Sequence, residues 1–187
     1  MNANDLPLVF FTLLSQLSTG LIVAGLVFMV FLRDDGFMQS LLLKRHILMI
    51  SLVLMGAALL ISFLHLARPA HSIFALSQLS RSWLSREILL GGIYFFSLAV
   101  AFVSLRISFI EPGTWVYIYA ASVVTGVILI WSMTRLYMLP TVPVWDHPST
   151  ALGFATTAIA GGGLLGLMLL PSLRIHISDE HFLQAVN

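Results

Sequence analysis

Two short polar runs hold the side chains of this sequence that could carry chemistry. Residues 65–69 (His-Leu-Ala-Arg-Pro) end one long apolar segment, and residues 82–87 (Ser-Trp-Leu-Ser-Arg-Glu) open the next. A neutral imidazole accepts a proton near pH 7, and a quinol that is oxidised needs an acceptor for its hydroxyl protons. His65 is therefore a candidate catalytic proton acceptor. The alternative is an interfacial histidine that lipid headgroups solvate.

Charged residues accompany His65 in these two runs. Arg68 lies three residues after His65, so the two share a face if the helix continues that far. Glu87 is either a proton acceptor or partner of Arg68, or a carboxylate that favours the positive N-terminus of a helix. Ser85 suits the N-cap of that helix. Adjacent positions on a helix point in different directions, so Arg86 and Glu87 need not pair.

Further candidates lie near the end of the fourth apolar segment. Arg135, two residues before Tyr137, either snorkels into the interface or donates hydrogen bonds into the same pocket. Residues 138–145 form a stiff, proline-containing loop that could cap this pocket or contact an external partner. We predict Arg81 and Trp145 as docking residues, because a basic outer loop would meet an acidic partner surface.

The composition is that of an integral membrane protein. Of the 187 residues, 59% are hydrophobic and only 9% are charged, against roughly a quarter charged in a soluble domain. The net charge of +1 leaves no electrostatic footprint for nucleic acid. Cysteine is absent, so the chain forms no disulfide and holds no iron–sulfur cluster through thiolates.

Five apolar segments are long enough to cross a bilayer, which takes about 20 mostly apolar residues. They run from about 6 to 32, 47 to 66, 88 to 105, 115 to 136 and 151 to 173. We therefore predict an all-α integral membrane protein, a bundle of about five transmembrane helices in one domain over residues 1–173. A polar tail follows at residues 174–187. The first segment lacks a basic start and a cleavage site, which predicts a retained helix.

The placement of lysine and arginine predicts an N-terminus outside and a first loop in the cytoplasm. The N-terminus carries no basic residue, whereas the first loop carries Arg33, Lys44 and Arg45. The second loop, which this orientation places outside, carries as many: Arg68, Arg81 and Arg86. Topology therefore does not explain why arginines are kept on the outer side.

The histidines do not suit a haem. A bis-histidine haem needs two imidazoles at similar depth on facing helices. His46 and His65 fall on the same predicted helix, separated by roughly 28 Å at 1.5 Å per residue. The third, fourth and fifth segments contain no histidine. We therefore expect neither haem nor a metal site in this chain.

Four motifs, taken in order, resemble the membrane anchor subunit of bacterial anaerobic dimethyl sulfoxide reductase. They are residues 65–69, 82–88, 135–137 and 141–145, and the resemblance covers essentially the whole chain. It implies a haem-free anchor in the bacterial inner membrane that oxidises menaquinol in anaerobic respiration. It also implies two partners, an iron–sulfur electron-transfer subunit and a molybdopterin catalytic subunit. Anchors of this family have about eight helices, whereas five are predicted here.

The resemblance assigns residues as well. His65 falls on the family histidine that is implicated in menaquinol binding, and four arginine and glutamate positions match as candidates for the same pocket: Arg68, Arg86, Glu87 and Arg135. We expect the quinol to bind near the outer border and His65 to accept a hydroxyl proton. Menaquinol is then a substrate, and the electrons pass to a cofactor in the iron–sulfur subunit.

Two other functions stay open at this point. A purely structural anchor would dock the soluble subunits without oxidising quinol, and quinol-dependent reduction of the partner's clusters separates the two. A small transporter is the third possibility. No charged residue is predicted deep within a segment, which argues against ion or proton translocation but not against a neutral substrate.

Overall fold

The computed structural model describes residues 6–31, 37–65, 78–106, 112–139, 141 and 144–172. These residues form long helices and contain no strand, which confirms the predicted all-α bundle. The five helices are α1 (Leu6–Phe31), α2 (Phe37–His65), α4 (Trp83–Ser104), α5 (Pro112–Tyr137) and α6 (Pro148–Ser172). The predicted polar tail lies outside the described residues.

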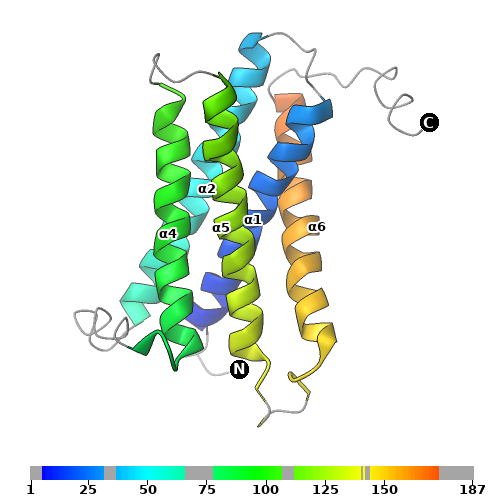
Figure 1. Cartoon of the computed structure of the whole chain (residues 1–187). Coiled ribbons are helices and arrows are strands. Elements are labelled where there is room, and N and C mark those ends of the chain that lie inside the picture. Colours follow the sequence, from blue (N-terminus) through cyan, green and yellow to red (C-terminus); the bar gives the residue numbers. More distant parts are fainter. Residues whose placement is uncertain are drawn as a thin grey trace.

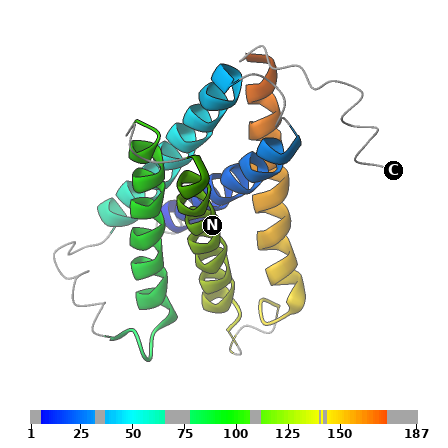
Figure 2. The same cartoon turned by 45° about the horizontal axis from the view of Figure 1, so that its top comes forward.

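Consecutive helices run in opposite directions around a central α1 (Figure 1). α1 packs against α2, α5 and α6, whereas α4 packs against α5 and α2. Figure 2 shows α1 crossing obliquely between its neighbours. One end of the bundle, at the bottom of Figure 1, gathers the N-terminal ends of α1, α4 and α6 with the C-terminal ends of α2 and α5. We call this the pocket end.

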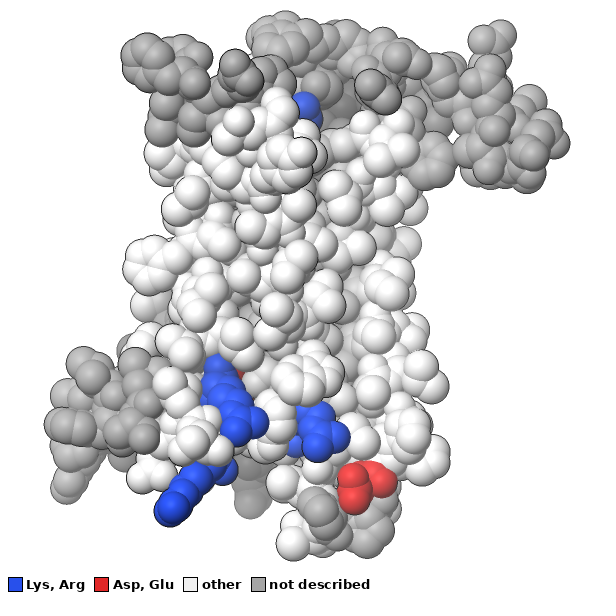
Figure 3. Space-filling model, viewed as in Figure 1, with Lys and Arg blue, Asp and Glu red and all other residues white. Residues whose placement is uncertain are grey.

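Each helix is long and apolar enough to cross a membrane, with a spanning part of 22 to 25 residues. In hydrocarbon, a backbone must satisfy its own N–H and C=O groups, which is why these apolar segments fold as helices. Figure 3 shows an uncharged surface in the middle of one face, with the charged side chains towards its two ends. The chain is a multi-pass membrane protein.

Four helices begin earlier than the predicted apolar segments. α2 and α4 begin before the charged residues that were expected to precede them, Lys44 and Glu87. A charged side chain does not interrupt backbone hydrogen bonding, so the helix continues past the last apolar residue. α5 and α6 each begin at a proline, Pro112 and Pro148. Proline suits the first helical position because it has no N–H to leave unpaired.

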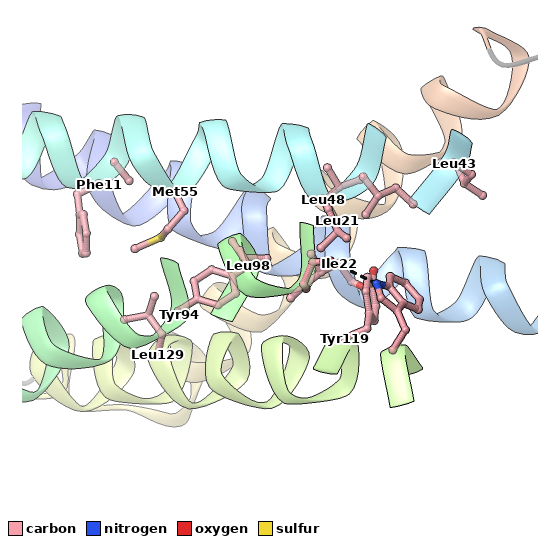
Figure 4. Close-up of a cluster of buried hydrophobic side chains, with 14 of the residues drawn as sticks. Phe11, Leu21, Ile22, Leu43, Leu48, Met55, Tyr94, Leu98, Tyr119 and Leu129 are labelled. Atoms are coloured by element: carbon pink, nitrogen blue, oxygen red, sulfur yellow. Dashed lines mark hydrogen bonds between the residues drawn. The ribbon is translucent and has the colours of Figure 1, made fainter. Parts of the chain in front are cut away.

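The core lies where α1, α2, α4 and α5 meet, and Figure 4 shows it from the side. Hydrogen bonds between helices supplement the apolar packing. The Tyr119 hydroxyl donates to the Ile22 carbonyl oxygen at 2.7 Å, which joins α5 to α1. The Ser18 hydroxyl donates to the Ser51 carbonyl oxygen at 2.8 Å and lies 3.0 Å from the Tyr94 hydroxyl. Each such bond contributes roughly 1 kcal/mol between membrane helices.

α6 is held against α1 by a close approach of the two backbones. A Cβ atom on Gly20 of α1 would overlap the carbonyl group of Ala158 on α6. A Cβ atom on Gly162 of α6 would overlap backbone atoms of Gly20 and Leu21. Small residues allow such approaches, and in lipid the resulting van der Waals contact drives helix association. The α1–α6 contact therefore depends on the absence of side chains.

Candidate functional site

A mostly apolar pocket lies at the pocket end, between α1, α2 and α4. It is lined by Leu8, Phe11, Leu59, Ser62, Phe63, Leu84, Glu87 and Ile88. Its volume is about 50 Å³. An enclosed cavity that takes up benzene measures about 150 Å³, so a ring would enter this pocket by its edge. The pocket suits the polar edge of a ligand whose remainder stays outside.

Glu87 is the charged residue of this pocket. Its side chain is only 2% exposed, yet neither carboxylate oxygen has a hydrogen-bond partner among the described residues. Removing an ionised carboxylate from water without donors costs several kcal/mol. An ionisable group kept inside a membrane domain is a functional candidate for that reason. Glu87 therefore offers unused hydrogen-bonding capacity to a ligand in the pocket.

The burial of Glu87 corrects one reading of the sequence. The N-cap of α4 is Ser82, whose Oγ accepts a hydrogen bond from the Ser85 backbone N–H at 3.3 Å. Ser85 is therefore not the N-cap, because the helix already begins at Trp83. The field of a helix end falls off within its first turn, and that turn holds no acidic residue. Stabilisation of the helix end does not account for Glu87.

The pocket opens to the surface of the bundle. Leu8, Phe63 and Leu84 line it and are 43%, 43% and 49% exposed. All three lie in the terminal turns of helices that are long and apolar enough to span a membrane. Glu87 is thus accessible from between these helix ends.

Arg86 is adjacent to Glu87 in the sequence, but its side chain contacts the segment before α4 and not the pocket. Its Nε donates to the Leu79 carbonyl oxygen at 2.8 Å, and its Nη2 donates to the Ser80 carbonyl oxygen at 2.9 Å. The guanidinium also lies over the Trp83 ring, 4.2 Å from the ring centroid. Arg86 therefore fastens the segment that leads into α4, and the described residues contain no ion pair between Arg86 and Glu87.

Replacing Arg86 with alanine is expected to destabilise the start of α4. The change removes two charge-assisted hydrogen bonds and a cation–π contact, which together contribute about 1–3 kcal/mol. Thermal unfolding of the purified chain in detergent measures the loss. Arg81→Ala is the matched control, because the Arg81 side chain is exposed and surface changes of this kind stay within about 0.5 kcal/mol. Equal effects of the two changes would contradict the role of Arg86.

Arg135 also converges on Trp83 and not on the pocket. Its guanidinium carbon lies 5.6 Å from the Trp83 ring centroid, and Arg135 does not line the pocket. Trp131, one turn earlier on α5, meets the edge of Trp83 with the ring centroids 5.2 Å apart. Trp83 thus joins Arg86 of α4 to Arg135 of α5.

The remaining predicted residues lie around the same end or outside the described residues. His65 is the last residue of α2, three residues after Ser62 of the pocket, and its side chain lies outside the described part. Arg68 lies wholly outside it. Arg81 and Trp145 are exposed in the connections before α4 and α6, and the Trp145 ring lies 6.1 Å from that of Tyr137. Within the described residues, no group of three or more acidic or histidine side chains could hold a metal ion.

Comparison with known families adds the decisive observation. Residues 1–186 match the model of the family described as DMSO reductase anchor subunit (DmsC). The chain belongs to this family. The family suggested by the four sequence motifs is thereby confirmed.

Curated relatives in the DmsC family come from two bacteria. The C subunit of anaerobic dimethyl sulfoxide reductase from Escherichia coli (strain K12) is 33% identical over 170 residues, which cover 89% of this chain and 58% of the relative. The YnfH subunit of the same organism is 29% identical over 180 residues, which cover 96% and 62%. The C subunit from Haemophilus influenzae is 29% identical over 182 residues, which cover 95% and 63%. The chain spans about three-fifths of the length of these relatives, and no solved structure matches it.

The site includes one residue that the sequence analysis did not name. Ser62 of α2 lines the pocket, and its position in the sequence does not distinguish it from the other serines of the chain. α1 does carry a signal, because buried polar residues recur every three or four positions along it: Thr12, Ser15, Gln16, Ser18 and Thr19. That spacing marks the face of α1 that points into the bundle.

Proposed function

We propose that this chain binds menaquinol in the pocket between α1, α2 and α4 and passes its electrons to an iron–sulfur partner subunit. The observation that carries the proposal is Glu87, a buried carboxylate without a partner among the described residues, in an apolar pocket that opens to the surface of the bundle. A quinol has matching chemistry: apolar ring faces, a hydroxyl donor at the ring edge, and a tail that stays in the bilayer. Membership of the DmsC family supports the role of the chain as the membrane anchor of a DMSO reductase.

Oxidation of one quinol releases two protons and two electrons and leaves a quinone. Glu87 accepts a hydrogen bond from one ring hydroxyl and orients the ring edge in the pocket. His65 accepts one hydroxyl proton, as expected from the sequence, and Glu87 accepts the other. Arg68 stays a candidate for orienting the ring, because a guanidinium remains protonated. The two electrons pass to the clusters of the iron–sulfur subunit. This chain has no cysteine and cannot hold such a cluster through thiolates, so the acceptor lies in the partner.

The partners and the orientation are part of the same proposal. In the inner membrane with the N-terminus outside, the pocket end faces outwards, and the quinol protons leave to that side. The exposed Arg81 and Trp145 lie in connections at this end, where they would contact the iron–sulfur subunit. A molybdopterin subunit then uses the electrons to reduce a substrate of the dimethyl sulfoxide type. The names of the curated relatives support this assembly.

A purely structural anchor is the alternative function. It would dock the same subunits but would need no buried carboxylate in an apolar pocket. The discriminating experiment adds a menaquinol analogue to membranes that contain this chain and its partner subunits and follows the optical or paramagnetic signal of the clusters. Reduction that depends on the analogue supports quinol oxidation. Clusters that stay oxidised while the complex remains assembled contradict it.

Replacing His65 with alanine is expected to weaken binding of a menaquinol analogue roughly tenfold or more, because a hydrogen bond at the reacting oxygen is lost. Fluorescence titration of the membranes with the analogue measures the affinity. His46→Ala is the matched control on the same helix, since the His46 ring bonds the Leu42 carbonyl oxygen at 2.7 Å, towards the other end of the bundle. An unchanged affinity in the His65→Ala variant would remove His65 from the proposal.

A further inference from the structure

A tryptophan and two arginines form a cationic cluster on the flank of the pocket end. Both guanidinium groups lie against Trp83: that of Arg86 at 4.2 Å and that of Arg135 at 5.6 Å from the ring centroid. Trp131 supports the same ring from its edge, with centroids 5.2 Å apart. Cation–π contacts of this kind contribute roughly 0.5–2 kcal/mol and fix the direction of a long side chain. We call these four residues the Trp83 cluster.

The two arginines of the Trp83 cluster differ in their hydrogen bonding. Arg86 uses Nε and Nη2 on the carbonyl oxygens of Leu79 and Ser80. Arg135 is exposed, and within the described residues its guanidinium makes the Trp83 contact but no hydrogen bond or ion pair. A guanidinium presents a planar fork of donors that matches carboxylate or phosphate in a bidentate manner. Arg135 therefore holds an oriented fork without an anionic partner in the described part of the protein.

The position of Arg135 decides which anion it meets. Trp131 and Arg135 lie four residues apart on α5 and share a face, and Trp131 is 55% exposed within the membrane-spanning part of α5. That face of α5 is exposed on the described bundle. Arg135 lies near the C-terminal end of the span. Figure 3 shows that basic side chains gather below the uncharged surface on the face it draws. The end of a membrane span lies at the depth of the phospholipid headgroups, so the Arg135 guanidinium is expected at that depth.

We propose that the Trp83 cluster is a binding site for one anionic phospholipid, with the headgroup phosphate on Arg135. Arg86 adds a second positive charge close by, which favours a headgroup with net negative charge over a zwitterionic one. The exposed side of Trp131 packs against the upper part of an acyl chain, as tryptophan does at membrane borders. Arg81 lies beyond the border in the loop, where a protein partner has access, so the two basic surfaces serve different partners.

The test measures lipid binding to the purified full-length protein in detergent by native mass spectrometry. Phosphatidylglycerol is titrated against phosphatidylcholine with the same acyl chains. The unmodified protein is expected to retain phosphatidylglycerol in preference, and Arg135→Gln is expected to weaken that binding about fivefold, the effect of one arginine at an anionic membrane surface. Arg106→Gln is the matched control, because Arg106 follows α4 at the opposite end and also lies near an aromatic ring, 5.7 Å from Phe102. Its phosphatidylglycerol binding should not change.

Several outcomes would overturn the proposal. Equal retention of both lipids, or equal losses in the Arg135→Gln and Arg106→Gln variants, would leave only unspecific charge attraction. Complete displacement of the lipid by an equal concentration of inorganic phosphate would indicate a free-anion site. Retention of lipid together with loss of the copurifying iron–sulfur subunit would make Arg135 a protein contact. Trp83→Leu gives a second measure: it should lower phosphatidylglycerol binding while the charge of both arginines is kept.

Discussion

Replacing Glu87 with leucine is expected to stabilise the bundle and, in the same variant, to weaken binding of a menaquinol analogue strongly. The carboxylate is buried without hydrogen-bond partners among the described residues, so an apolar side chain of similar size suits the folded state better by about 1–3 kcal/mol. The ligand loses its polar partner in an apolar pocket. A hydrogen bond to a charged group contributes about 1.5–3 kcal/mol, which corresponds to roughly a ten- to hundredfold loss of affinity.

Two measurements on one variant separate a functional carboxylate from a structural one. Thermal unfolding in detergent reports stability, titration with the analogue reports binding, and the two effects should have opposite signs. Glu87→Gln keeps the shape and removes the charge, and it should lose most of the affinity. Asp146→Asn is the matched control, because Asp146 is an exposed carboxylate outside the pocket. If the leucine variant unfolds at a lower temperature, Glu87 stabilises the fold and the proposed reason for its burial is wrong.

Replacing Gly162 with leucine is expected to detach α6 from α1. The new side chain would begin inside the backbone atoms of Gly20 and Leu21, which are held in α1 and cannot rotate away. Overpacking usually costs about 1–3 kcal/mol, and occasionally more; the upper part of this range applies here because backbone has to move. Thermal unfolding and the rate of proteolysis in the connection before α6 both report the change.

The neighbouring glycine supplies the control. A Cβ atom on Gly163 would meet nothing within 4 Å, so Gly163→Leu adds the same side chain to the same helix without a clash. Because leucine favours a helix over glycine by up to about 1 kcal/mol, that variant should unfold at the same or a higher temperature. Gly20→Leu should reproduce the loss from the α1 side. Equal stability of the Gly162→Leu and Gly163→Leu variants would contradict the close packing of α1 and α6.

Part of the candidate site could be predicted from residue types and order. Glu87 and Arg86 are charged residues beside an apolar segment, and a charge near a membrane border needs a partner or a function. The contacts that these two side chains make could not be predicted from residues 82–87 alone. Arg86 and Glu87 are adjacent in the sequence, yet one bonds the carbonyl groups before α4 and the other faces the pocket. The difference depends on where α4 begins, and the predicted segment began five positions too late.

The pocket itself depended on helix packing. Leu8, Ser62 and Glu87 come from three helices and meet because α1, α2 and α4 pack at one end. Arg135, expected to donate into the pocket, lies against Trp83 on the flank instead. In water, the polar face of a helix reveals which face is buried. In lipid, both the inner and the outer face are apolar, so the sequence pattern leaves the rotation of most of these helices open.

The sequence by itself therefore determined a five-helix membrane bundle, the border at which the charged residues gather, and the family, because length, hydropathy and ordered motifs are properties of the sequence alone. The tertiary structure decided which of those residues share a pocket. The cause is physical: the free energy that packs helices in a membrane comes from close contacts such as that of Gly20 with Gly162. Such contacts set the rotation and depth of each helix, and with them the isolation of Glu87 and the position of Arg135 on Trp83.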